Sequence, residues 1–243
     1  MRIFNGLDNL PVFTNAVATM GSFDGVHSGH RVLLDRVKQL ATELGGESIV
    51  LTFEPHPRYV LGTGDDMLLL TTIDEKLWLL EQMGIDNVIV IPFTTEFSLL
   101  SPEEYIEQVV AKLSLRALVV GYNHRFGHKK EGDYDFLERR NDFEVYMVEQ
   151  QRVVGGKVSS TILRQLLSQG LNDKAATLLG HSYLICATFD EDGSARVDQH
   201  KLLPAEGSYD VEANGERSTL HVASDSTLRL EPKVQGKVQI WLK

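Results

Sequence analysis

Two histidines separated by two residues are the strongest chemical signal in this sequence. His27 and His30 belong to the run GSFDGVHSGH at positions 21–30, between a short hydrophobic run and an amphipathic one. At a helix start both imidazoles can face one way, and Gly29 leaves room for a phosphate near backbone N–H groups. We interpret the run as a phosphate-binding turn. The alternative is that both histidines are ordinary surface or capping residues.

A bound phosphate would decide the charge of these two imidazoles. A helix N-terminus disfavours an imidazolium by ~0.3–1 kcal/mol. A phosphate oxygen ~4 Å away favours it by ~4 kcal/mol at an effective dielectric constant of about 20. We therefore expect both rings to donate to a polyphosphate, stabilising charge rather than acting as nucleophiles.

A second candidate phosphate site combines hydroxyl groups with a guanidinium. Ser159, Ser160 and Thr161 precede a short helical pattern, and Arg164 lies one turn into it. Hydroxyls, free backbone N–H groups and an arginine together suit a phosphate clamp. A plain N-cap followed by a surface arginine is the alternative.

Two further loops follow predicted strands. Residues 121–133, GYNHRFGHKKEGD, place cations between glycines, and we interpret them as a mobile flap over phosphates; a solvated loop is the alternative. Residues 52–58, TFEPHPR, contain two prolines that fix a rigid loop able to wall a flat ring. His56, between those prolines, is expected to be a structural hydrogen-bonding residue rather than a catalyst.

Hydrophobic periodicity predicts the elements that position these motifs. Short buried strands are expected at 16–20, 48–53, 87–92, 117–121 and 144–148. Helices are expected at 30–44, 72–83, 102–113, 161–168 and 173–179. This alternation predicts an α/β domain, residues 1–182, with a doubly wound parallel sheet. Ligands of such sheets bind at the carboxyl ends of the strands. Short alternating strands from Tyr183 onward predict a small C-terminal β domain, residues 183–243.

Composition narrows the possible partners. The formal net charge is −10, which argues against nonspecific binding to nucleic acid or an anionic membrane. The single cysteine, Cys186, forms no internal disulfide, and the N-terminus does not resemble a signal peptide. No apolar stretch approaches the ~18 residues that span a bilayer. We expect a cytoplasmic protein.

The four motifs, in this order, resemble the adenylyltransferase module of bacterial bifunctional riboflavin kinase/FMN adenylyltransferases, the FAD synthetases. The resemblance covers about residues 10–185 and implies a sheet of the nucleotidyltransferase, Rossmann-like type. It also includes the runs Leu70-Thr71-Thr72 with Glu75-Lys76, Pro92-Phe93-Thr94, Leu100-Ser101-Pro102-Glu103-Glu104-Tyr105 and Leu178-Leu179-Gly180. The family often has Asp-Phe or Asn-Phe before Arg-Phe-Gly, where this chain has Asn123-His124.

The resemblance implies Mg²⁺-dependent transfer of AMP from ATP to the phosphate of FMN, giving FAD and pyrophosphate. By motif match, the catalytic residues are His27, His30 and Arg164. The implied ATP-binding residues are Gly21, Ser22, Phe23, Asn123, Arg125, Ser159, Ser160 and Thr161. The implied flavin-binding residues are Phe53, Pro55, His56, Pro57 and His124. No protein ligand to a metal is implied.

The C-terminal region departs from that family. The family's kinase module is a β-barrel of well over a hundred residues with a Gly-Phe-Pro-Thr-Ala-Asn run, which this chain lacks. The run from Lys201 to Tyr209 is similar to one barrel strand, so we expect a truncated kinase module without kinase activity. Truncation after Gly180 is expected to lower stability or solubility and to leave the adenylyl-transfer site chemically complete. Two alternatives remain: a nucleotidyltransferase for another small phosphate, and a non-catalytic flavin- or nucleotide-binding regulator.

Overall fold

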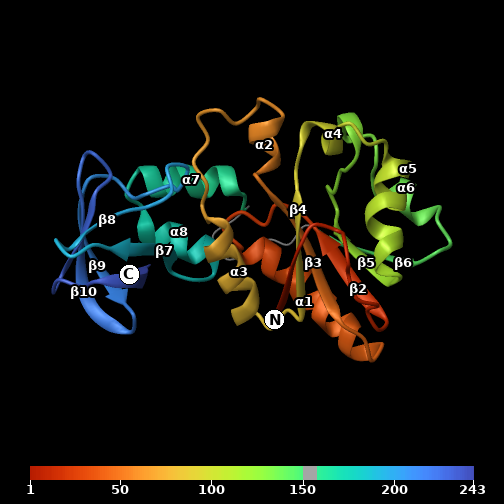
Figure 1. The fold of residues 1–243 in the computed structure, drawn as a ribbon, viewed down its shortest axis with the longest axis horizontal. Coiled ribbons are helices and arrows are strands. Elements are labelled where there is room, and N and C mark those ends of the chain that lie inside the picture. Colours follow the sequence, from red (N-terminus) through yellow and green to blue (C-terminus); the bar gives the residue numbers. More distant parts are fainter. Residues whose placement is uncertain (150–157) are drawn as a thin grey trace. The chain divides into compact units, whose positions relative to one another are not determined.

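The structure, a computed structural model, describes residues 1–149 and 158–243 (Figure 1). The chain folds into two compact units that interleave along the sequence. Unit 1 comprises Met1–Phe23, His30–Asp66 and Leu79–Gln151. Unit 2 comprises Asp24–Gly29, Met67–Trp78 and Arg152–Lys243. This grouping places residues 158–182 with the C-terminal strands, whereas the domain boundary after residue 182 stays a prediction.

Unit 1 is built on one parallel sheet. Its strands are β1 (Arg2–Asn5), β2 (Ala16–Met20), β3 (Ser48–Glu54), β4 (Asn87–Pro92), β5 (Leu115–Gly121) and β6 (Glu144–Val148). Within the described residues their order is β1-β4-β3-β2-β5-β6, and every pairing is parallel. The predicted doubly wound sheet is confirmed. The edge strand β1 is an addition to the prediction, because its short run RIFN is mostly exposed and lacks a buried hydrophobic pattern.

Helices cover both faces of this sheet. Helix α1 (Ser28–Glu43) packs Val37, Leu40 and Ala41 against one face. The helical segment 102–113 packs Tyr105, Ile106 and neighbouring apolar residues against the other face. Other helices with residues in unit 1 are α2 (Pro57–Val60), α3 (Ile73–Gln82), α4 (Thr95–Ser98) and α6 (Tyr134–Glu138), together with a 3₁₀ turn at His128–Lys130.

The segment predicted as one helix at 102–113 changes its hydrogen-bonding pattern along its length. It begins as α5 (Pro102–Tyr105), where Ser101 and Glu104 form a reciprocal capping box, as the Ser-Pro start predicts. It continues as a π-helical turn, Ile106–Val110, and ends in a 3₁₀ turn, Ala111–Leu113. The helical prediction is therefore right, but the local winding was not visible in the hydrophobic pattern.

Unit 2 contains a closed antiparallel barrel. Its strands are β7 (Tyr183–Phe189), β8 (Ser194–Arg196), β9 (Gly207–Ala213), β10 (Glu216–Val222), β11 (Leu228–Glu231) and β12 (Gly236–Leu242). The described strands close in the order β10-β11-β8-β7-β12-β9, with β9 pairing back to β10. The expected small β domain is confirmed, and closure leaves it without open sheet edges. Helices α7 (Ser160–Ser168) and α8 (Asn172–Leu179) share its apolar core, for example through Leu163 and Leu178.

A buried ion pair joins the barrel to the 67–78 segment. The Lys201 ammonium donates to Glu75 Oε2, to the Leu70 carbonyl and to the Leu184 carbonyl, each at 2.7 Å. Glu75 Oε1 accepts from the Cys186 backbone N–H at 2.7 Å. Both charged side chains are completely buried, so each charge depends on these partners rather than on water.

No helix in the part of the chain that the structure describes is long and apolar enough to cross a membrane.

Removing one member of the buried Lys201–Glu75 ion pair is expected to destabilise the folded chain strongly. Lys201→Met leaves the Glu75 carboxylate buried without its cation and should lower the free energy of unfolding by about 3–5 kcal/mol. Chemical denaturation measures this. Lys237→Met is the matched control, because Lys237 pairs with Asp74 in the same unit with both side chains mostly exposed. A Lys201→Met cost no larger than that of the control would contradict the prediction.

Candidate active site

Three predicted loops follow neighbouring strands of the unit 1 sheet. Gly21 follows β2, Pro55 follows β3, and Asn123 lies two residues beyond β5. Because these strands are parallel and adjacent in the order β3-β2-β5, their carboxyl ends meet at one sheet edge. The chain order reverses at β2, which makes this edge the switch point where ligands of doubly wound sheets bind. The structure therefore brings residues 21–23, 53–57 and 123–125 to the expected edge.

The loop after β3 is held locally and stands beside an aromatic cluster. His56 Nδ1 accepts the backbone N–H of Arg58 at 3.2 Å and caps α2. The half-buried Phe53 ring packs edge-on against Phe93 at 5.5 Å and lies 6.0 Å from Phe97. Phe93 and Phe97 were not among the predicted site residues. The signal for Phe93 was its position directly after β4, the neighbour of β3.

The segment predicted as a flap has defined internal contacts. Phe126 and Gly132 exchange two backbone hydrogen bonds of 3.0 Å, and Arg125 forms an ion pair with Asp133. A Cβ on Gly132 would lie only 2.6 Å from the Phe126 ring, so this close approach requires glycine. Asn123 and Arg125 are exposed. Mobility of the segment stays a prediction.

His124 lies within this segment and stacks on the Phe126 ring, with centroids 5.7 Å apart. Burial lowers the pKa of His124 to about 4. The ring is therefore neutral at neutral pH.

In unit 2, the 24–29 loop that contains His27 is fastened on several sides. The Gly25 N–H donates to Thr71 Oγ1 at 3.0 Å, and His181 Nε2 lies 3.1 Å from the Gly25 carbonyl oxygen. Val26 has a φ of 40°, which is unusual for a β-branched residue. Such a strained backbone conformation persists only where the surrounding contacts hold it in place. His27 is 7% exposed, and burial lowers its pKa to about 4. The neighbouring Asp24 carboxylate opposes that shift.

Helix α7 carries the second predicted phosphate cluster. Ser159 Oγ accepts the Ile162 N–H as an N-cap, and Thr161 is exposed. Ser160 Oγ donates to the Asp24 carbonyl oxygen at 3.0 Å. Arg164 is not a surface residue: its side chain is 16% exposed and forms an ion pair with the Asp24 carboxylate, which is 2% exposed. Within unit 2, the structure thus brings Ser160 and Arg164 directly onto the loop that contains His27.

This network bears on the effect of truncation after Gly180, which stays a prediction. The carboxylate of Asp24 accepts backbone N–H groups of Leu70 and Thr71. The same 67–78 segment receives Lys201 from the barrel, as described above. Removing the barrel would therefore remove support from the segment that holds the 24–29 loop.

These features define the class of protein: a nucleotidyltransferase-like α/β sheet combined with a barrel. A family model described as FAD synthetase matches residues 11–162. A bifunctional riboflavin kinase/FMN adenylyltransferase of Listeria monocytogenes is 34% identical over 218 residues, covering 83% of this chain and 69% of that protein. The corresponding protein of Escherichia coli is 32% identical over 231 residues, covering 88% and 74%. The chain belongs to the FAD synthetase family.

A solved structure shares the fold over the whole chain. The crystal structure of a protein titled macrolide-efflux protein, from Streptococcus pneumoniae, has a TM-score of 0.84 and 22% sequence identity. It covers 100% of this chain and 90% of that one. At this level of identity the likeness concerns the fold alone.

Two imidazoles with lowered pKa values, those of His27 and His124, predict how stability depends on pH. His27 and His124 have folded-state pKa values of about 4, below the value of about 6.5 in an unfolded chain. The folded state binds fewer protons, so stability is complete above about pH 6.5 and falls as the pH drops toward 4. Each ring should cost about 2 kcal/mol between pH 7 and pH 5.

Denaturant titrations at pH 7 and pH 5 test this. His124→Phe should lose less stability over the interval than the unmodified chain, because one protonation site is gone. The exposed His200, changed to Gln, serves as control and should follow the unmodified chain. Equal losses in all three proteins would refute the assignment.

Proposed function

We propose that the protein is an FMN adenylyltransferase. A phosphate oxygen of FMN attacks the α-phosphorus of ATP, the bond from that phosphorus to the bridging oxygen breaks, and pyrophosphate leaves. The observation that supports this most is the contact between the two phosphate motifs in unit 2. Ser160 and Arg164 of α7 both bond Asp24 of the loop that contains His27. Membership of the FAD synthetase family supports FMN as the acceptor of the adenylyl group.

Magnesium is proposed to arrive with the nucleotide as part of the substrate. Among residues 1–149 and 158–243, no group of three or more His, Cys, Asp or Glu side chains could hold a metal ion. The Asp24 carboxylate is already occupied by Arg164 and two backbone N–H groups. The negative phosphates of ATP are therefore the natural ligands.

His27 and His30 are proposed to stabilise charge on the departing phosphates. Burial of His27 opposes its protonation, so the expected positive charge carries a cost. Holding His27 protonated at pH 7 with a pKa of about 4 costs about 4 kcal/mol, at 1.36 kcal/mol per pH unit. This cost is similar to the ~4 kcal/mol that one adjacent phosphate oxygen supplies. His27 is therefore balanced between a neutral single donor and an imidazolium, and a polyphosphate tips it toward the charged form.

The flavin is proposed to lie against the aromatic cluster at the edge of the sheet. Phe53, Phe93 and Phe97 are half-buried and pack pairwise with ring centroids 5.5–6.0 Å apart. A flat isoalloxazine ring gains from burial against such rings. Pro55 and Pro57 stiffen the adjoining loop.

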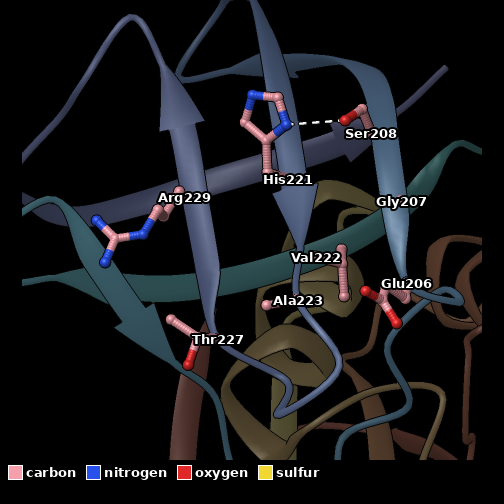
Figure 2. Close-up of a pocket in the computed structure, with 8 residues that line it drawn as sticks. All are labelled: Glu206, Gly207, Ser208, His221, Val222, Ala223, Thr227 and Arg229. Atoms are coloured by element: carbon pink, nitrogen blue, oxygen red, sulfur yellow. Dashed lines mark hydrogen bonds between the residues drawn. The ribbon is translucent and has the colours of Figure 1, made fainter.

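The barrel is proposed to lack riboflavin kinase activity. It has a pocket of about 230 Å³ on its surface, lined by Glu206, Gly207, Ser208, His221, Val222, Ala223, Thr227 and Arg229 (Figure 2). Ser208 Oγ and His221 Nδ1 lie 2.8 Å apart in this pocket. Phosphoryl transfer needs a positioned set of donors and metal contacts around the triphosphate. The Thr-Ala-Asn segment that the family's kinase module uses for nucleotide and metal is absent from the sequence.

Loss of either histidine is expected to slow FAD formation. His27→Ala or His30→Ala should lower kcat by about 10²–10³, as removal of one charge-stabilising donor does elsewhere. FAD is measured by chromatography after incubation with MgATP and FMN, with folding checked by thermal unfolding. His221→Ala, in the barrel pocket, is the control and should retain full turnover. Near-normal turnover in both histidine variants would overturn their assignment.

The expected absence of riboflavin kinase activity is tested by replacing FMN with riboflavin as the substrate. The full-length chain, incubated with MgATP and riboflavin, should produce no FMN, while the same preparation converts FMN to FAD. Clear formation of FMN would show a second active site in the barrel. Absence of FAD from FMN would instead favour another phosphate acceptor or a regulator that only binds nucleotide.

A further inference from the structure

Asp24 is the charged group of the 24–29 loop for which the proposed chemistry has no role. It lies three residues before His27 and is 2% exposed. A carboxylate beside a site for polyphosphate repels the ligand unless its charge is compensated. Its place in the loop therefore calls for a specific function.

The contacts of Asp24 fix both of its carboxylate oxygens. Oδ1 accepts the backbone N–H groups of Leu70 at 2.9 Å and Thr71 at 3.1 Å. Oδ2 pairs with Nη2 of Arg164. The backbone carbonyl of Asp24 accepts Ser160 Oγ, so the residue contacts α7 through its main chain and its side chain.

Arg164 is held at two points as a result. Its Nε donates to the Leu68 carbonyl at 2.5 Å while its Nη2 bonds Asp24. The planar guanidinium can make both bonds at once, and a lysine ammonium on a flexible stem cannot reproduce that geometry. The arginine is thus held in place by contacts within the folded chain itself.

We propose that Asp24 is a positioning residue for adenylyl transfer, which holds the Arg164 guanidinium beside the 24–29 loop in the orientation that binds the triphosphate of ATP. The proposal rests on the proposed function. An arginine fixed during folding does not lose its side-chain freedom again on binding, so affinity for ATP is higher. The ion pair also neutralises the carboxylate, so the loop does not repel phosphate.

The isosteric variant Asp24→Asn tests this directly. It keeps an oxygen for the Leu70 and Thr71 N–H groups and removes the charge that holds Arg164. We expect the Kd for MgATP, measured by calorimetry, to rise about 30-fold. At 1.36 kcal/mol per factor of ten this equals the ~2 kcal/mol of rotamer freedom of an arginine side chain. The KM for FMN should remain within about twofold, and kcat at saturating ATP should fall much less than ATP affinity.

A double-mutant cycle separates positioning from a general structural effect. In an Arg164→Met background, Asp24→Asn should not raise the Kd for MgATP, because the guanidinium that Asp24 positions is gone and the uncompensated carboxylate that the change removes would repel phosphate. Equal losses of affinity with and without Arg164 would overturn the proposal, as would unchanged ATP affinity in Asp24→Asn. Arg164→Lys, which keeps the charge but cannot bond Asp24 and Leu68 together, should raise the Kd about tenfold and offers a test if Asp24→Asn does not fold.

Leu220→Ala is the destabilising control. It opens a cavity in the barrel core, where Leu220 is fully buried, and should lower the melting temperature while leaving the Kd for MgATP within about twofold. A 30-fold loss in this control as well would assign the Asp24 effect to lost stability. Because the readout is ATP binding, it distinguishes the two ideas: a chain that binds ATP through Asp24 and Arg164 but makes no FAD would sink only the proposed function.

Discussion

The candidate site depends on the interactions of one buried group, the carboxylate of Asp24, with Arg164 and with two backbone N–H groups. A buried charge is tolerated only where hydrogen bonds and an opposite charge replace water. Here the partners come from two distant segments, the backbone at 70–71 and Arg164 on α7. Satisfying this one carboxylate therefore fixes the relative positions of the 24–29 loop, the 67–78 segment and the start of α7.

A second buried charge holds the same segment from the other side. Glu75 accepts from Lys201 and from the Cys186 N–H, while Lys201 also bonds the carbonyl of Leu70. Leu70 thus donates its N–H to Asp24 and offers its carbonyl to Lys201. Leu70 therefore connects the 24–29 loop to the barrel through its own peptide groups. The barrel is consequently a support for this loop.

The sequence was informative where a local pattern determines a local structure. Buried runs such as those of β2 and β4 located the parallel strands, and the Ser101-Pro102 pair located a helix start. The site was predicted as segments because the carboxyl ends of adjacent parallel strands must meet at one edge. What the sequence did not reveal were pairings between distant residues. Asp24 and Arg164 are 140 positions apart, and no spacing rule links them.

Some signals for these pairings were nevertheless present. A carboxylate inside a predicted phosphate-binding loop requires a cation nearby. The sequence therefore indicates that Asp24 has a cationic partner, but it does not identify which lysine or arginine that partner is. The sequence gives less indication that the barrel closes. Its strands of three to seven residues are too short for the alternation of apolar and polar side chains to determine which strands pair. Lys201 resembled any exposed lysine, because burial of a charged side chain is decided by the tertiary structure alone.

The interleaving of the two units also bears on the order in which the site forms during synthesis. A ribosome makes the chain from its N-terminus at about 5–20 residues per second. The strands of the parallel sheet lie within the first 148 residues and can pair early. Arg164 and Lys201 emerge later, so the 24–29 loop lacks its cationic partner and its support from the barrel until residue 201 has been made. A chain terminated before Arg164 would retain the strands of the sheet without the ion pair that holds this loop.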